Sequence, residues 1–305
     1  MKKSVKILIF VAIGVIILGV GICALGIAIG GLNLQNYSFG EAVELQTNTI
    51  GVKDDFSSVD IDLETGDIYF VPSTDGTASV EAYTAEKAEF SAEVRDGTLY
   101  IVCKDGRKWY ERISLFGGGK EKLTVTVPAK DYAKLNIVAA SSDIHIPADF
   151  SFENAAVKCT TGDGEFAADV KDKLSYEVVT GDLDISDTQP NELSVKFNTG
   201  DLKMSDINCG SLDVTGITGV IKLSNTVSQK DTNIKNITGD LVFDSCDAQN
   251  ISVNLTTGDI KGTLLSEKEF KAKATTGDVD VPNTSASGKC EINVITGDIN
   301  MDIEK

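Results

Sequence analysis

The sequence is poor in the residue types from which most active sites are built. Its 305 residues include one histidine (His145), one tryptophan and only 7% aromatic residues. A single histidine leaves little basis for a Ser/His/Asp or Cys/His catalytic combination. There is no Cys-x-x-Cys or Cys/His cluster of the kind that binds zinc. We therefore expect a protein that is not an enzyme and has no cofactor or metal site, with His145 as a surface residue.

Positive charge and proline are scarce as well. The chain has 28 Lys and Arg residues against 46 Asp and Glu residues, which gives a formal net charge of −18. Nucleic acids and anionic membrane surfaces attract basic proteins, so we expect neither as a ligand for the bulk of the chain. Five prolines against 28 glycines favour many short strands joined by tight turns.

A long apolar run occurs once, at residues 7–32, and contains no charged residue. About 20 apolar residues span a bilayer as a helix, whereas a secretory signal has an apolar core of about 7–15 residues. We therefore predict a cytoplasmic stub (1–6), an uncleaved transmembrane anchor (7–32) and a juxtamembrane linker (33–50). Lys2, Lys3 and Lys6 predict a single-pass protein of the cell membrane whose C-terminal domain is extracytoplasmic.

The predicted extracytoplasmic part is strongly acidic. Removing the three anchor lysines leaves 25 basic and 46 acidic residues, a charge near −21. It holds an odd number of irregularly spaced cysteines, which is not a disulfide framework. They are Cys103, Cys159, Cys209, Cys246 and Cys290.

Against these absences stands a repeated triplet, Thr-Gly-Asp. The steps between its successive glycines are 19 or 20 residues, and the one exception among them reads Thr218-Gly219-Val220. Ser142 takes the glycine slot one step earlier, and Thr65-Gly66-Asp67 lies far upstream. The regularly spaced glycines are Gly162, Gly181, Gly200, Gly219, Gly239, Gly258, Gly277 and Gly297.

Apolar residues alternate on both sides of each triplet. Around Gly181 they are Leu174, Tyr176, Val178, Leu183 and Ile185, at −7, −5, −3, +2 and +4. Alternation at period two predicts two half-buried strands. A fixed period near 20 over many units indicates stacked coils, so we predict an all-β fold, a single-chain β-solenoid with 19–20-residue coils that follows one transmembrane helix. The opposite corner of each coil is expected to be loose and variable.

The region before the regular repeats is less uniform. Residues 142–305 are predicted to form the regular coils, and residues 51–141 irregular, hairpin-extended coils with a hairpin turn at Asp96-Gly97. A loop at 106–122 interrupts them and mixes aromatic with basic side chains. This loop is a candidate partner-binding segment or a cover for the solenoid edge. Its aromatic candidates are Trp109, Tyr110 and Phe116.

We interpret the triplets as structural corners. Gly adopts positive φ without steric cost, and Asp accepts hydrogen bonds from nearby backbone N–H groups. The predicted turn ladder comprises Gly66, Asp67, Gly162, Asp163, Gly181, Asp182, Gly200, Asp201, Gly219, Gly239, Asp240, Gly258, Asp259, Gly277, Asp278, Gly297 and Asp298.

Three functional interpretations compete with this structural one. A calcium-binding β-roll is a minor alternative, because one Asp per coil offers few of the 6–8 oxygens that calcium prefers. Ice binding needs a flat face of paired threonines, and the triplet threonines are expected at a corner. Polysaccharide cleavage needs two opposed carboxylates in different environments, which uniform exposed aspartates do not provide.

The layout as a whole resembles a known family. After the anchor come “FSSVDIDLETGDIYF”, “DGTLYI”, “KLTVTVP” and the run of Thr/Ser-Gly-Asp units. From about Phe56 to the C-terminus this is similar to the bacterial adhesin-like family DUF4097, common in Gram-positive bacteria. The resemblance implies a membrane-anchored β-solenoid of the cell envelope and supplies no catalytic residues.

Two functional classes follow as expectations. The first is a cell-surface binding or scaffolding protein, an adhesin that binds a glycan, the cell wall or a protein. The second is an accessory partner subunit of a membrane stress or transport system, recognised through the anchor or the Trp109 loop.

Overall fold

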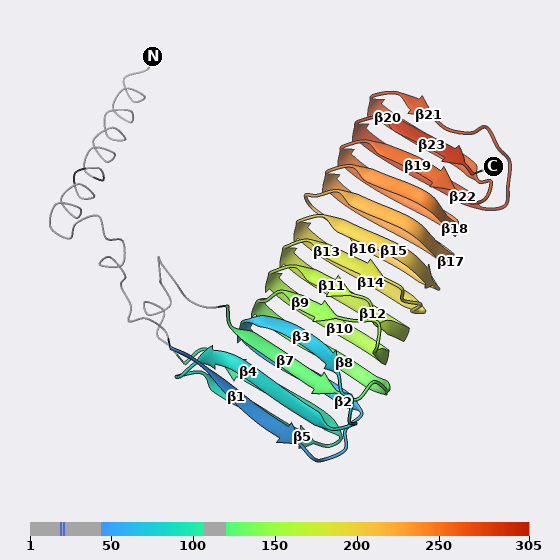
Figure 1. Cartoon of the computed structure of the whole chain (residues 1–305). Helices are drawn as coiled ribbons and strands as arrows, with labels where there is room; N and C mark the ends of the chain where they lie inside the picture. Colours follow the sequence, from blue (N-terminus) through green and yellow to red (C-terminus); the bar gives the residue numbers. More distant parts are fainter. Residues whose placement is uncertain (1–18, 20, 22–43, 107–119, 305) are drawn as a thin grey trace. The chain divides into compact units, whose positions relative to one another are not determined.

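The computed structural model describes residues 44–106 and 120–304, together with Gly19 and Gly21. Residues 45–106 and 120–304 form one unit, an all-β solenoid whose coils are stacked on one another (Figure 1). The predicted β-solenoid is therefore confirmed. Apart from Gly19 and Gly21, the predicted anchor (7–32) lies outside the described residues, as do Trp109, Tyr110 and Phe116. Within the described part, no helix is long and apolar enough to cross a membrane.

Each regular coil has a strand before its glycine corner and a strand after it. The strands before the corner form one face of the stack, joined by parallel pairing except between the first two listed. In stacking order they are β5 (Glu89–Arg95), β6 (Thr98–Lys104), β2 (Ser58–Thr65), β8 (Asp131–Ser141), β10 (Ser151–Thr161), β12 (Asp169–Thr180), β14 (Glu192–Thr199), β16 (Ser211–Thr215), the second half of β17 (Ile221–Thr238), the second half of β18 (Leu241–Thr257), β22 (Lys289–Thr296) and β20 (Glu269–Thr276).

The strands after the corner form the second face, where the first two pairings are antiparallel and the others parallel. In stacking order they are β1 (Leu45–Val52), β4 (Ala78–Ala85), β7 (Lys122–Val127), β3 (Asp67–Pro72), β9 (Ile144–Ile146), β11 (Gly164–Phe166), β13 (Leu183–Ser186), β15 (Leu202–Cys209), the first half of β17, the first half of β18, β19 (Ile260–Leu264), β23 (Ile299–Ile303) and β21 (Val279–Asp280). Residues 45–50, predicted as linker, belong to β1.

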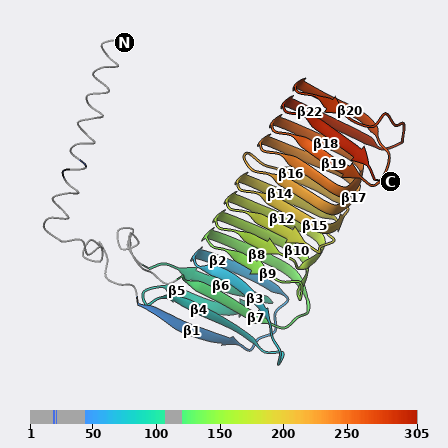
Figure 2. The same ribbon diagram turned by 45° about the horizontal axis from the view of Figure 1, so that its top comes forward.

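The stacking order departs from the chain order at both ends. At the C-terminal end, β18 pairs with β22 and β22 pairs with β20, so the last coil of the chain lies beneath the coil that precedes it. Figure 2 shows β20 outermost with β22 and then β18 below it. At the other end, β2 lies between β8 and β6, so the Gly66 coil stacks directly on the Ser142 coil. The C-terminal strand, β23, is covered by β21.

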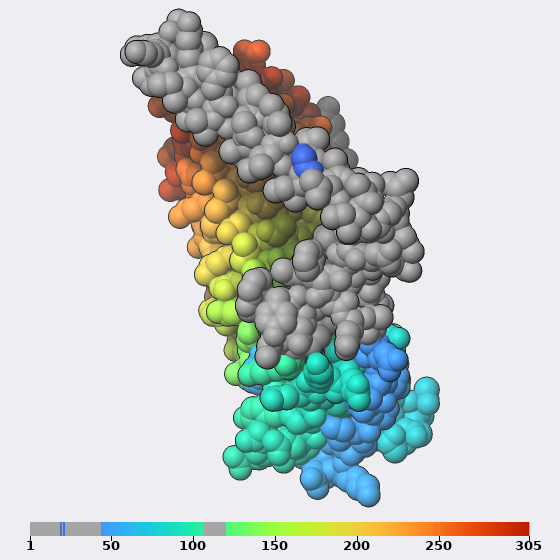
Figure 3. Space-filling view, turned by 90° about the vertical axis from the view of Figure 1, so that its left-hand side faces the viewer, coloured from blue at the N-terminus to red at the C-terminus, as the bar shows by residue number. Residues whose placement is uncertain are grey.

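The inside of the coils is a continuous apolar core. The alternation predicted around Gly181 is present, because Leu174, Val178, Leu183 and Ile185 are all buried. In the space-filling view of Figure 3 the colours run from green through yellow and orange to red along the stack, so coils that follow one another in the sequence lie next to one another. Each coil has a second corner opposite its glycine corner. In the first coils an aromatic stack fills this second corner, because Tyr132 lies between the rings of Phe56 and Phe152, with centroids 6.0 and 5.7 Å away.

The second corner is more regular than predicted. In four consecutive coils a non-glycine residue with positive φ occurs six positions after the corner glycine. Asn and Asp tolerate this backbone conformation better than most residues, because their short polar side chains bond locally. The residues are Asp187, Asp206, Asn225 and Ser245, with φ between 47° and 57°.

All five cysteines of the described stack are free and buried. Burial raises the pKa of Cys209 and of Cys290 to about 12, so these thiols stay protonated at neutral pH. They therefore pack as small apolar side chains and are poor nucleophiles.

Candidate functional site

The glycine corners are held by close contact between neighbouring coils. Gly181 has a φ of +146°, and a Cβ at Gly200 would lie 2.0 Å from the carbonyl oxygen of Gly181. The Gly181 N–H donates to the Thr199 carbonyl of the next coil at 3.0 Å. Both the positive φ and the close approach require glycine. The corner at Ser142 is made without a positive φ.

The aspartates of the triplets act between coils. The carboxylate of Asp182 accepts a hydrogen bond from the backbone N–H of Asp201 at 2.7 Å, and Asp163 accepts in the same way from Asp182 at 2.8 Å. The sequence predicted that Asp closes its own turn. Instead, one carboxylate oxygen of each of these aspartates satisfies a backbone group of the neighbouring coil, which links the coils into an aspartate ladder.

The ladder has one gap, at the triplet that lacks aspartate. Val220 donates its N–H to Asp201 at 2.8 Å but offers no carboxylate to the following coil. The ladder resumes where the Asp259 N–H donates to Asp240 at 2.9 Å. The stack therefore tolerates the loss of one rung. In the described part of the chain, no three His, Cys, Asp or Glu residues gather in a way that could hold a metal ion.

A chemically different site lies where the Gly66 coil meets the Ser142 coil. A hollow of about 210 Å³ there is lined by Tyr69, Asp143, Ile144, His145, Asp163 and Glu165. The Nδ1 atom of His145 lies 2.8 Å from a carboxylate oxygen of Glu165. The rings of Tyr69 and His145 have centroids 6.0 Å apart. We call this set the junction site.

Two lysines border the junction site. The Nζ atom of Lys122 lies 4.5 Å from the centre of the Tyr69 ring, a cation–π contact. The Nζ atom of Lys120 lies 3.6 Å from a carboxylate oxygen of Asp143 and 3.8 Å from one of Asp67. Lys120 is the first described residue after position 119.

The junction site combines an aromatic ring with several hydrogen-bonding side chains. Its ring offers an apolar face, and its imidazole and carboxylates offer hydrogen-bond donors and acceptors. His145, predicted as a surface residue, is part of it, with 40% of its side chain exposed. Tyr69 was not among the predicted site residues. The sequence signal for it was the 76-residue step from Gly66 to Ser142, which contains no clean triplet. In the structure the two coils stack directly, so Tyr69 at position +3 of one pairs with His145 at position +3 of the other.

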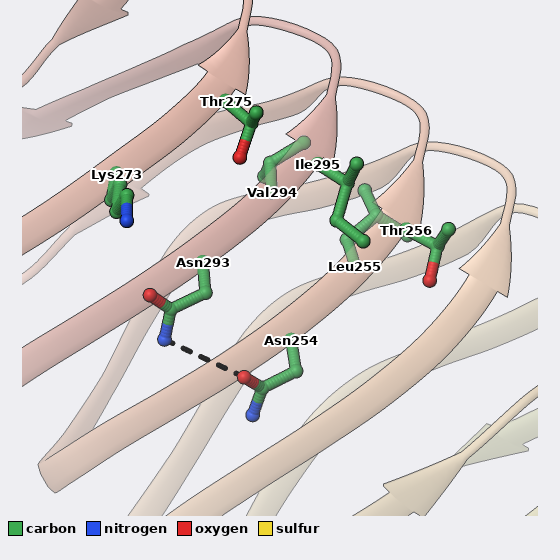
Figure 4. Close-up of a pocket in the computed structure, with 8 residues that line it drawn as sticks. All are labelled: Asn254, Leu255, Thr256, Lys273, Thr275, Asn293, Val294 and Ile295. Carbon is green, nitrogen blue, oxygen red and sulfur yellow. Dashed lines mark hydrogen bonds between the residues drawn. The ribbon is translucent and has the colours of Figure 1, made fainter.

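A second feature follows the corners along the whole stack. Next to the aspartate ladder runs an exposed threonine column at position −1, paired from coil to coil as in Thr180 with Thr199 and Thr238 with Thr257. Position −2 alternates between aliphatic and polar residues and is called here the aliphatic column. Position −4 carries four lysines and is called here the lysine column. Figure 4 shows these columns near the C-terminal end of the stack. Ile295 and Thr275 lie near the corner, and Asn293 and Lys273 lie farther along the strands.

The fold and its corners place the described residues among the β-solenoid repeat proteins. The chain belongs to the family described as Toastrack DUF4097, whose model matches residues 56–235 and 167–305. The predicted family membership is therefore confirmed. No curated protein matches the sequence.

Solved structures with a similar course of the chain come from Bacteroides fragilis and Parabacteroides distasonis. One, described as a “putative adhesin” from Bacteroides fragilis, is 15% identical, covers 85% of this chain and 97% of its own, and has a TM-score of 0.45. A “putative adhesin” from Parabacteroides distasonis is 10% identical, with coverages of 86% and 98% and a TM-score of 0.41. A “putative lipid binding protein” from the same species is 15% identical, with coverages of 83% and 97% and a TM-score of 0.37.

Proposed function

We propose that this protein is a non-catalytic binding or scaffolding protein of the cell surface that recognises an envelope glycan at the junction site. The observation that supports this most directly is the hollow in which a tyrosine, a histidine and three carboxylates meet. An aromatic ring stacks on the apolar face of a sugar ring, while carboxylates and imidazole bond its hydroxyl groups. The predicted anchor at residues 7–32 would hold this site outside the membrane.

The test is binding of the full-length, detergent-solubilised protein to isolated cell-wall sacculi. We expect the unaltered protein to sediment with sacculi. A Tyr69→Ala/His145→Ala variant should bind about tenfold more weakly, because it loses about 1.4 kcal/mol of contacts. Tyr83→Ala is the matched control, since Tyr83 is an exposed tyrosine on β4 outside the junction site. Equal sedimentation of all three proteins would contradict the proposal.

The same experiment on intact cells separates the accessory-subunit alternative. A crosslinked membrane protein that is captured equally by the unaltered chain and the Tyr69→Ala/His145→Ala variant would favour a partner held by the anchor or by loop 107–119. Loss of that partner on deletion of residues 107–119 would assign it to the loop. Orientation is tested independently by an alkaline phosphatase fusion after residue 304, which is active only outside the cytoplasm.

A further inference from the structure

The columns beside the corners carry apolar groups that the described chain leaves uncovered. In the aliphatic column, Val179, Ile217, Ile237 and Ile295 are between 42% and 54% exposed. Scattered exposed aliphatic residues are ordinary, but these four lie in one column, interrupted by Asn198 and Thr256, beside a continuous threonine column. In stacking order the aliphatic column is Ala140, Thr160, Val179, Asn198, Ile217, Ile237, Thr256, Ile295 and Thr275.

Charged side chains flank these columns on both sides. On one side, Lys235 and Lys273 form no ion pair within residues 44–106 and 120–304, while Lys158 and Lys196 share the single carboxylate of Glu177. On the other side, the aspartate ladder from Asp163 onward has no lysine or arginine of the described stack against it. In stacking order the lysine column is Val138, Lys158, Glu177, Lys196, Thr215, Lys235, Asn254, Asn293 and Lys273.

The order of the columns selects the partner. Across the corner it runs lysine column, aliphatic column, threonine column, aspartate ladder. A two-fold axis parallel to the stack reverses this order in a second copy. The lysine column of each copy then faces the aspartate ladder of the other, and the aliphatic and threonine columns meet in the middle. We propose that a second copy of this chain binds here, side by side and parallel.

Two features favour this pairing over other arrangements of the same two faces. Both copies have the same step of about 4.8 Å between strands, so a match made at one coil repeats at the next. A two-fold axis perpendicular to the stack would instead place the lysine columns against each other. Nearby aspartates repel one another by roughly 1 kcal/mol per neighbouring pair in water, and facing lysines relieve that repulsion.

The size of the face sets the strength of the pairing. Nine stacked coils span about 40 Å, and the columns together are about 15 Å wide, so each copy would bury about 600 Å². A standard interface buries about 800 Å² per partner, so the dimer is weak in free solution. Two copies held in one membrane gain effective concentration, and this step, like the crosslinking in membranes described below, rests on the anchoring proposed above.

The test is disulfide crosslinking of the full chain in native membranes. In a Cys23→Ser background, the remaining native cysteines are buried and do not compete. Val179→Cys and Ile295→Cys lie near the proposed axis and five coils apart in the stack. Each variant alone should form a disulfide-linked dimer on mild oxidation. The matched control is Lys222→Cys, an exposed lysine on the opposite face that should form none.

The outcomes distinguish the arrangements. If dimers form only when the Val179→Cys and Ile295→Cys proteins are mixed, the pair is antiparallel and the proposal is wrong. The proposal is also wrong if neither variant crosslinks more strongly than the Lys222→Cys control. Adding Lys235→Glu/Lys273→Glu should reduce the Ile295→Cys dimer several-fold, whereas Lys222→Glu/Lys261→Glu should not. These readouts are independent of sacculus binding, so either proposal can fail alone.

Discussion

The two ends of the stack cover the open end of the apolar core in different ways. At each end the coils are stacked out of chain order, so the Gly66 coil and the last coil of the chain are both covered by other strands. The N-terminal end then finishes with antiparallel strands, β5 on one face and β4 with β1 on the other. The C-terminal end finishes with β20 and β21, which have only parallel partners. The unpaired edges thus belong to β5 and β20, which carry charged residues, to the two-residue β21 and to the largely polar β1.

The difference is visible in burial. Leu99 and Ile101 of β6 are fully buried, because β5 and the strands beyond cover that end of the core. Phe270 and Ala272 of β20 face the core but remain half-buried. The C-terminal end therefore depends on the inserted coil beneath it, whereas the N-terminal end has a cover of several strands.

The largest expected effect comes from removing the inserted coil. A chain that ends at Gly288 loses β22 and β23, whose buried side chains include Ile292, Ile299 and Met301. Burial of each such side chain contributes about 1.5–3 kcal/mol, so the loss exceeds about 4 kcal/mol. β20 and β21 lose their only strand partners as well. We expect limited proteolysis to remove residues 265–288 and to spare the coils before them.

The matched deletion is at the other end. Removing residues 45–52 takes away β1, most of which is exposed, and should leave the rest of the stack resistant. If residues 265–288 of the shortened chain stayed protected, or if both deletions were equally damaging, the proposed difference between the ends would be wrong.

The second largest loss of stability is expected from a methyl group added at a glycine corner. Gly200→Ala places a Cβ 2.0 Å from the Gly181 carbonyl oxygen at a φ of +138°. Backbone strain of this kind costs about 1–3 kcal/mol, and the overlap adds to it. Thermal unfolding should show a midpoint lowered by several degrees. Gly277→Ala meets a comparable clash in the outermost coil, so it should release β20 and β21 with little change in the main transition. Equal midpoints for the two variants would contradict this.

A stabilising change is expected in the middle of the ladder. Val220→Asp supplies the missing carboxylate, which can accept from the Asp240 N–H as its neighbours do. A hydrogen bond to a charged group contributes about 1.5–3 kcal/mol, and repulsion from adjacent aspartates reduces it to about 1 kcal/mol. Val220→Asn retains an acceptor without the charge and should stabilise at least as much at low salt. A midpoint lowered by both variants in thermal unfolding would show that the gap has another cause.

The sequence predicted the coil but not the order of coils at the ends. The period and the alternation around each glycine fix the inward and outward positions, because every unit obeys the same local rule. The Gly277 and Gly297 units have nearly the same corner and the same spacing, so local pattern cannot decide which of them lies outermost. The junction site was missed for a related reason. Tyr69 and His145 are 76 residues apart in the sequence, and they meet because the Gly66 coil stacks directly on the Ser142 coil.

The smallest expected effect is in the turn between β3 and β4, at the N-terminal end. The carboxylate of Asp75 accepts hydrogen bonds from the Thr77 hydroxyl at 2.7 Å, the Thr77 N–H at 3.0 Å and the Ser73 hydroxyl at 2.9 Å. These bonds, those from Thr77 first, lower the pKa of Asp75 from 3.8 to about 2. A lowered pKa in the folded state contributes stability above the unfolded pKa, which is lost as the pH falls through about 2.

Asp75→Asn tests this turn against the rest of the N-terminal cover. Because Asp75 is fully exposed, solvent screens the interaction, and the midpoint at pH 7 should fall by less than about 1 °C. The difference from the unaltered protein should shrink between pH 4 and pH 2, as the carboxylate that the variant lacks becomes protonated. A drop of several degrees at pH 7, or a difference that persists at pH 2, would mean that the turn supports the cover of β4 and β1 through packing and not through the charge of Asp75.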